Sequence, residues 1–137
     1  MAEAILAAQK EVINRKYELE ERLWNLQSAF ECVEAKAESL SGGNWSVVGS
    51  ALGFANQIFK DSVALLAEDD APDPDKHASV PRRLWSIFAI YECVQSHVES
   101  KLIGDTSSVS NALALLNPDL YRQIGELADL LTDGGCE

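Results

Sequence analysis

The chain repeats itself, with residues 22–70 resembling residues 83–131 at positions 61 apart and without a gap. The clearest matches carry rare residue types: Arg22-Leu23-Trp24 returns as Arg83-Leu84-Trp85, and Glu31-Cys32-Val33 returns as Glu92-Cys93-Val94. Two unrelated amphipathic helices share apolar positions by chance far more readily than they share both tryptophan and cysteine at one offset. The pattern therefore predicts one helical hairpin that is used twice.

The composition fits a single domain. A chain of 137 residues can bury its own core without disulfide or metal support. Its 47% hydrophobic and 24% charged content is typical of globular proteins and argues against global disorder. We therefore expect one helical domain over residues 1–137.

The charge balance excludes several partners. Twenty-two acidic and eleven basic residues give a formal net charge of −11, which opposes binding to nucleic acid or to anionic membranes.

No apolar run approaches the roughly 20 residues that a bilayer requires. The first residues carry an acid where a signal peptide carries bases, and three widely spaced cysteines favour free thiols in a reducing compartment. We expect a cytoplasmic protein that binds neither nucleic acid nor a membrane.

Hydrophobic spacing predicts a long first helix and a second helix after a glycine turn. An apolar residue recurs every seven positions from Ile5 to Leu40, so the first helix should cover residues 2–40. Ser41-Gly42-Gly43-Asn44 should end it and cap a second helix over residues 45–67.

The second half begins with a linker over residues 68–79, in which acids and two prolines predict a solvated connector that includes His77. A third helix should start at Ser79. A fourth should start near Ser107, and Asn117-Pro118-Asp119 predicts that this last helix is kinked or broken there. The fold class is all-α, a four-helix bundle-like arrangement built from two tandem hairpins, with a long N-terminal helix.

The repeat begins only at Arg22, so residues 1–21 have no counterpart in the second half. The first helix should therefore extend beyond the hairpin by up to five turns, with a partly apolar seam that needs a partner. We expect a homodimer. The residues predicted to form the dimer seam are Ile5, Val12, Leu19 and Leu26.

Trp24 and Trp85 are the candidate surface for a protein partner, since tryptophan is enriched at binding hot spots, although packing at the edge of the core is the more common role. Cys32 and Cys93 could approach each other across the repeat, but small buried hydrophobes are the more common reading. Gly49 and Gly53 favour close helix packing over a ligand cleft.

No nucleophile, general base, phosphate loop or metal-ligand spacing is present, so we expect no catalytic residues, no cofactor and no metal site. The favoured function is a non-catalytic protein-interaction or regulatory protein that acts through helical surfaces. Two alternatives remain. One is an acidic inhibitor, immunity-type protein or nucleic-acid mimic that covers a basic surface, and the other is a helical bundle that binds a small ligand.

Overall fold

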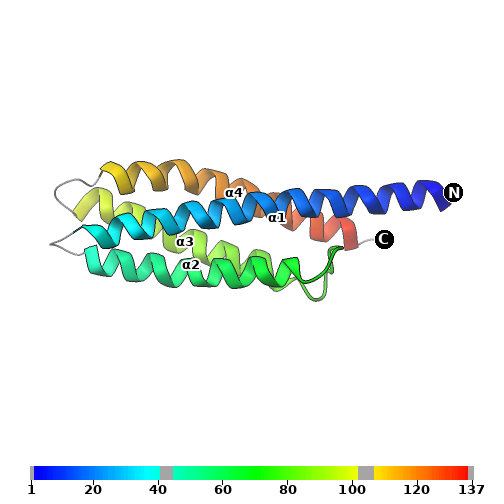
Figure 1. Cartoon of the computed structure of the whole chain (residues 1–137), viewed down its shortest axis with the longest axis horizontal. Coiled ribbons are helices and arrows are strands. Elements are labelled where there is room, and N and C mark those ends of the chain that lie inside the picture. Colours follow the sequence, from blue (N-terminus) through cyan, green and yellow to red (C-terminus); the bar gives the residue numbers. More distant parts are fainter. Residues whose placement is uncertain (1, 41–44, 102–106, 136–137) are drawn as a thin grey trace.

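The computed structural model describes residues 2–40, 45–101 and 107–135, and it confirms the predicted all-α fold. Four helices make up this part of the chain: α1 (Ala2–Ser39), α2 (Trp45–Ala67), α3 (Ser79–Lys101) and α4 (Ser107–Gly135). They run alternately up and down along one long axis, and each helix packs against two neighbours in the order α1, α2, α3, α4 and back to α1 (Figure 1). This is the geometry of an antiparallel four-helix bundle.

The core consists of corresponding positions from the two halves of the chain. Eight large side chains at its centre are inaccessible to solvent, and they form four pairs of positions 61 apart: Leu23 and Leu84, Phe30 and Tyr91, Leu52 and Leu113, Phe59 and Leu120. In each pair the two residues lie on different hairpins. The heptad spacing places these side chains on one face of each helix, and that face is the one that the bundle buries.

Of the kink or break expected in the last helix, the break is wrong, because α4 continues through Pro118. Proline has no backbone N–H, so it leaves the carbonyl group of Ala114 without its usual intrahelical donor. Packing holds the helix on both sides of this point, since Leu113 and Leu120 are both completely buried. Asn117 does not act as a cap; its Nδ2 donates to Oε1 of Gln95 on α3 over 2.8 Å.

The expectation of a solvated linker is wrong for His77, although most residues of the segment are exposed. The segment between α2 and α3 folds back onto α1, where the Tyr17 hydroxyl donates to the Asp70 carboxylate over 2.8 Å. Within the segment, Oδ1 of Asp73 accepts from the backbone N–H groups of Asp75 and Lys76. His77 is 0% exposed. The prolines therefore shape a folded connection rather than an extended one.

Candidate functional site

The N-terminal end of α1 extends past the rest of the bundle as a single helix (Figure 1). We call residues 2–15 the arm. Every residue from 2 to 11 is exposed, and Ile5 and Leu6 are 59% and 57% exposed. Val12 and Ile13 are half-buried at the place where the arm meets the bundle. The fully exposed part spans about three turns, shorter than the five that the sequence indicated.

One face of the arm carries two apolar rows. Helical spacing places Ile5 in line with Val12, and Leu6 in line with Ile13, with Gln9 between the two rows. The predicted seam included only the first row. A stripe of this width is typical of a helix face that packs against another element.

Leu19 and Leu26 are not part of an exposed seam, which corrects two of its four predicted residues. Both side chains are buried in the hydrophobic core of their own bundle. Neighbouring helices reach far enough along α1 to cover these positions but not Ile5. A second chain could therefore contact Ile5 and, in part, Val12.

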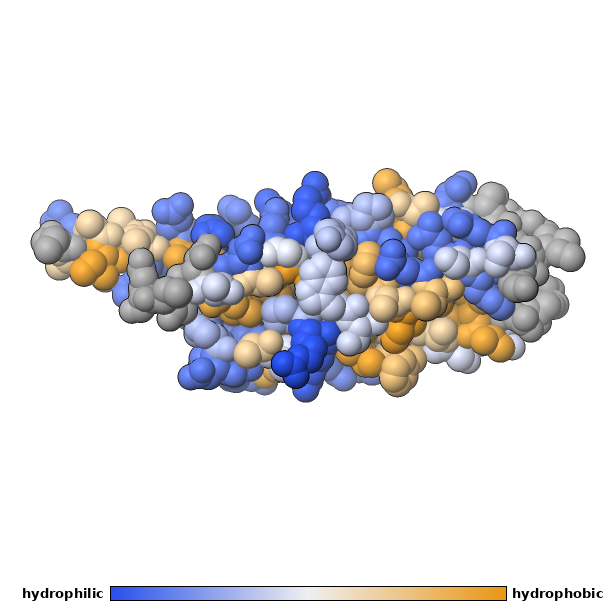
Figure 2. All heavy atoms as spheres, turned by 180° about the vertical axis from the view of Figure 1, so that it is seen from behind, coloured by the Kyte–Doolittle hydropathy of each residue, from blue (hydrophilic) through white to orange (hydrophobic). Residues whose placement is uncertain are grey.

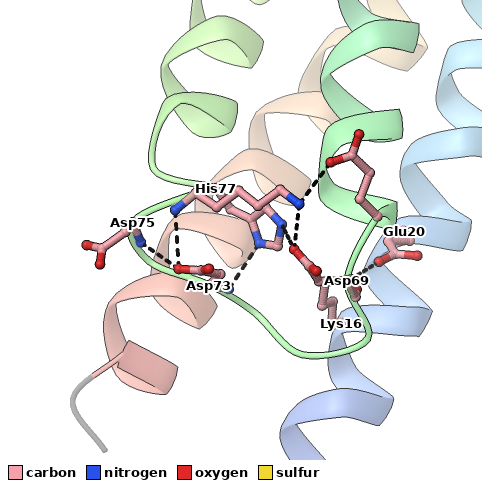
Figure 3. A network of polar contacts seen from close by, with 8 residues as sticks. Lys16, Glu20, Asp69, Asp73, Asp75 and His77 are labelled. Atoms are coloured by element: carbon pink, nitrogen blue, oxygen red, sulfur yellow. Dashed lines mark hydrogen bonds and ion pairs between the residues drawn. The ribbon is translucent and has the colours of Figure 1, made fainter.

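A buried lysine marks the base of the arm. Lys16 lies on the same helix face as Gln9, yet its side chain is only 1% exposed. Its ammonium group pairs with the Glu20 carboxylate and donates to the backbone carbonyl oxygen of Asp69 in the linker (Figure 3). The linker thus covers this face of α1 at Lys16 and leaves it bare before that point.

The buried imidazole of His77 contacts two other residues of the same linker, Asp73 and Asp69. Its Nδ1 accepts from the backbone N–H of Asp73 over 3.0 Å, and its Nε2 lies 3.4 Å from Oδ2 of Asp69 (Figure 3). Since a backbone N–H always donates, Nδ1 must be unprotonated, and the imidazole proton belongs on Nε2. Burial, followed by the charge of Lys16, lowers the pKa of His77. A hydrogen bond from Lys76 lowers the pKa of Asp69.

A second apolar surface lies between α2 and α3. The groove there has a volume of about 310 Å³, and its lining residues are Val47, Val48, Ala51, Ala89, Ile90, Cys93, Val94 and His97. These positions belong to the half of the bundle farthest from the arm. Hydrophobic side chains gather on that half in Figure 2, and others lie along the arm. Phe54, one turn from Ala51 along α2, is 63% exposed.

The two candidate tryptophans have different surroundings. Trp85 on α3 is partly exposed and packs edge-on against Phe88 and against Tyr121 of α4, with ring centroids 5.9 and 5.1 Å away. Trp24 is half-buried against the core. No ring contact joins the two tryptophans within the described ranges. Their role as a surface for a protein partner stays a prediction.

Cys32 and Cys93 are both exposed free thiols, so the expectation that they are small buried hydrophobes is wrong. Heptad position places each sulfur next to the seam, and the seam valines that follow them are the residues that the core buries. Cys136 lies outside the described residues.

Gly49 and Gly53 allow glutamate side chains of α1 to pack closely against α2. An added methyl group at Gly53 would lie 3.0 Å from Oε2 of Glu34, and one at Gly49 would lie 3.1 Å from Cγ of Glu38. The glycines therefore let two glutamate side chains of α1 lie along α2, beside a cleft of about 390 Å³. Hydrogen bonding between Glu34 and Glu38 raises the pKa of Glu38.

Among the described residues, no group of three or more His, Cys, Asp or Glu side chains could hold a metal ion. None of the helices in the described ranges combines the length and apolar character that a membrane span needs. We found no match to this chain among protein families, curated proteins or solved structures. The arm, the α2–α3 groove and the linker network are therefore interpreted from their own chemistry.

Proposed function

We propose that this protein is a non-catalytic interaction protein that forms a homodimer through its arm and presents its helical surfaces to a protein partner. The observation that supports the proposal is the bare apolar face of the arm. Ile5 and Leu6 are more than half exposed there, and no other helix of the described part of the chain covers them. Burying such a side chain contributes roughly 1.5–3 kcal/mol when burial is complete.

The charge of the arm supports self-association. The arm contains two acids, Glu3 and Glu11, and two bases, Lys10 and Arg15, so its net charge is zero in a chain of net charge −11. Two copies that meet through their bodies would bring like charges together. A contact made by a neutral arm avoids most of that repulsion, because charges more than about 8–10 Å apart are screened at physiological salt.

The length of the arm also favours self-association. A free helical segment of fewer than about 12–15 residues is marginal in water, and most helical stability in proteins comes from packing of the apolar face. A second chain that covers Ile5 and Leu6 would supply that packing. The base of the arm is already held by Lys16, which fixes the direction in which the arm leaves the bundle.

The test is the mass in solution of two matched variants. Ile5→Glu with Leu6→Glu places two carboxylates on the apolar rows, and Ala4→Glu with Ala7→Glu places the same charges on the opposite side of the arm. All four positions are exposed, so neither variant disturbs the core. We expect the first variant to be a monomer and the second to remain a dimer in sedimentation velocity. Equal masses for both variants would contradict the proposal.

A further inference from the structure

The groove between α2 and α3 is uncharged in a strongly acidic protein. Residues 45–59, which form most of α2, contain no Asp, Glu, Lys or Arg, and within residues 84–98 of α3 only Glu92 is charged. Val47, which lines this groove, is 61% exposed. Because Ala51 and Ala89 are small, another helix could approach the floor of the groove closely.

The repeat indicates that the fold does not require this apolar surface. The corresponding positions, 61 residues away, lie on the neighbouring helices α4 and α1. There Val47 is replaced by Ser108, Ala89 by Ser28, Ile90 by Ala29 and His97 by Lys36. The same hairpin packing therefore accepts smaller or polar residues at these places. Apolar side chains in the α2–α3 groove call for an explanation other than bundle stability.

The arm has the chemistry that fits this groove. From Ala89 to His97 the groove follows α3 for 8 residue steps, which is about 12 Å at 1.5 Å per residue. Residues 5–13 of the arm cover the same length and carry both apolar rows. Neither surface brings net charge to the contact. Helix-in-groove binding uses apolar anchors at the spacing of Ile5 and Val12.

The arm cannot reach the groove of its own chain. It leaves the bundle at the end where the linker lies, and it points away from the body (Figure 1). Val47, at the start of α2, lies near the opposite end. An arm that fills the groove must therefore come from another molecule.

We propose that the arm of one copy docks in the α2–α3 groove of a second copy, with the exchange made twice about a two-fold axis. This inference rests on the proposed homodimer and names its acceptor surface. A reciprocal exchange covers both apolar surfaces of each chain and closes the assembly, whereas a one-way exchange would build an open filament.

A pair of variants that the repeat provides tests the acceptor surface. Val47→Glu introduces a carboxylate in the groove, and Ser108→Glu introduces the same charge at the corresponding exposed position on the other side of the bundle. We expect Val47→Glu to weaken dimerisation by roughly tenfold or more and Ser108→Glu to leave it unchanged. If both variants remain dimers as tight as the wild type, the groove is not the acceptor, although the homodimer still stands. If the wild type is a monomer, both proposals fail.

Disulfide trapping gives an independent readout. Gln9→Cys is made in a background of Cys32→Ser and Cys136→Ser, so that Cys93 in the groove is the only native thiol. With diamide as the oxidant, docking predicts a covalent dimer that is lost when Cys93→Ser is added. A covalent dimer that survives Cys93→Ser would mean that two arms pair with each other. That result, or the absence of any covalent dimer, would overturn the inference.

Discussion

Phe30 and Tyr91 stack face to face across the centre of the bundle, with ring centroids 3.8 Å apart and ring planes 7° from parallel. They come from diagonally opposite helices, α1 and α3, and they occupy positions 61 apart. Only one of them carries a hydroxyl group. Tyr91 donates it to Oδ1 of Asn56 on α2, and Asn56 also donates to the backbone carbonyl oxygen of Phe30 over 3.2 Å. Asn56 therefore links α1 and α3 at the centre of the core through hydrogen bonds to both Phe30 and Tyr91.

Removing that hydroxyl should destabilise the fold. Tyr91→Phe leaves the buried Oδ1 of Asn56 without its donor, so we expect a loss of about 1–3 kcal/mol in the free energy of unfolding. Urea denaturation measures it. Tyr121→Phe is the control, because Tyr121 is exposed and its stability effect should be near zero. A similar loss of unfolding free energy in both variants would show that the buried hydrogen bond from Tyr91 to Asn56 stabilises the fold no more than an exposed hydroxyl group does.

Adding a hydroxyl group at Phe30, the position that corresponds to Tyr91, should stabilise the fold. Asn117 corresponds to Asn56 in the repeat, it is buried, and its Oδ1 has no hydrogen-bond partner within the described residues. Phe30 occupies the position that corresponds to Tyr91, so by the relation between Tyr91 and Asn56 a hydroxyl group there is expected to reach Asn117. We expect Phe30→Tyr to raise the free energy of unfolding by about 0.5–1.5 kcal/mol. The same urea measurement checks it, and a lower stability would indicate that the ring stack leaves no room for the oxygen.

Stability should fall on mild acidification because of His77. Its pKa is lowered, so below its ordinary value of 6.5 the unfolded chain binds more protons than the folded one. The contribution of His77 is complete above pH 6.5 and is lost as the pH falls through the lower folded pKa. The charged groups that act on its pKa are Lys16 of α1 and Asp69, Asp73 and Lys76 of the linker.

The measurement is the unfolding free energy from about pH 7.5 to about pH 5, the range in which histidine titrates. His77→Gln should flatten the curve in this range. His97→Gln, which leaves the linker network intact, should keep the wild-type slope. The lowered pKa of Asp69 adds a further loss below its ordinary value of 3.8. A wild-type curve that is flat down to pH 5 would contradict the assignment of a neutral His77.

Replacing Lys16 should destabilise the fold, although a lysine on a helix is usually exposed to solvent. Lys16→Met leaves the mostly buried Glu20 without its partner, so we expect a loss of about 3 kcal/mol, typical of a broken buried ion pair. Adding Glu20→Leu should recover much of this loss, since both charges are then gone. The comparison uses thermal or urea unfolding of the three proteins. No recovery in the double variant would mean that the bond from Lys16 to the Asp69 carbonyl oxygen contributes most of the loss.

The positions of the helices and of the core could be predicted from the sequence because both follow from local spacing. Heptad rows identify the buried faces, and the offset of 61 positions relates the two hairpins. The break at Pro118 was wrong because a local signal competes with the packing of Leu113 and Leu120, which no local pattern reveals. His77 was assigned to solvent because burial in a linker depends on a distant contact with Lys16.

The exposed surfaces were predicted only in part. A heptad row continues from Ile5 to Leu19 without a change in pattern, so the sequence does not reveal where neighbouring helices stop covering it. Leu19 was therefore assigned to the dimer seam although it lies in the core. The α2–α3 groove was missed, but a signal was present: residues 45–59 form an uncharged run in an acidic chain.

The most direct test of the central claim is sedimentation equilibrium of the wild-type protein from low micromolar to near-millimolar concentration. We expect a monomer–dimer equilibrium that approaches twice the chain mass of 15.0 kDa at the upper end. The thermal midpoint should rise with concentration in parallel. A mass of one chain throughout, with a constant thermal midpoint, would contradict the claim that the arm joins two copies.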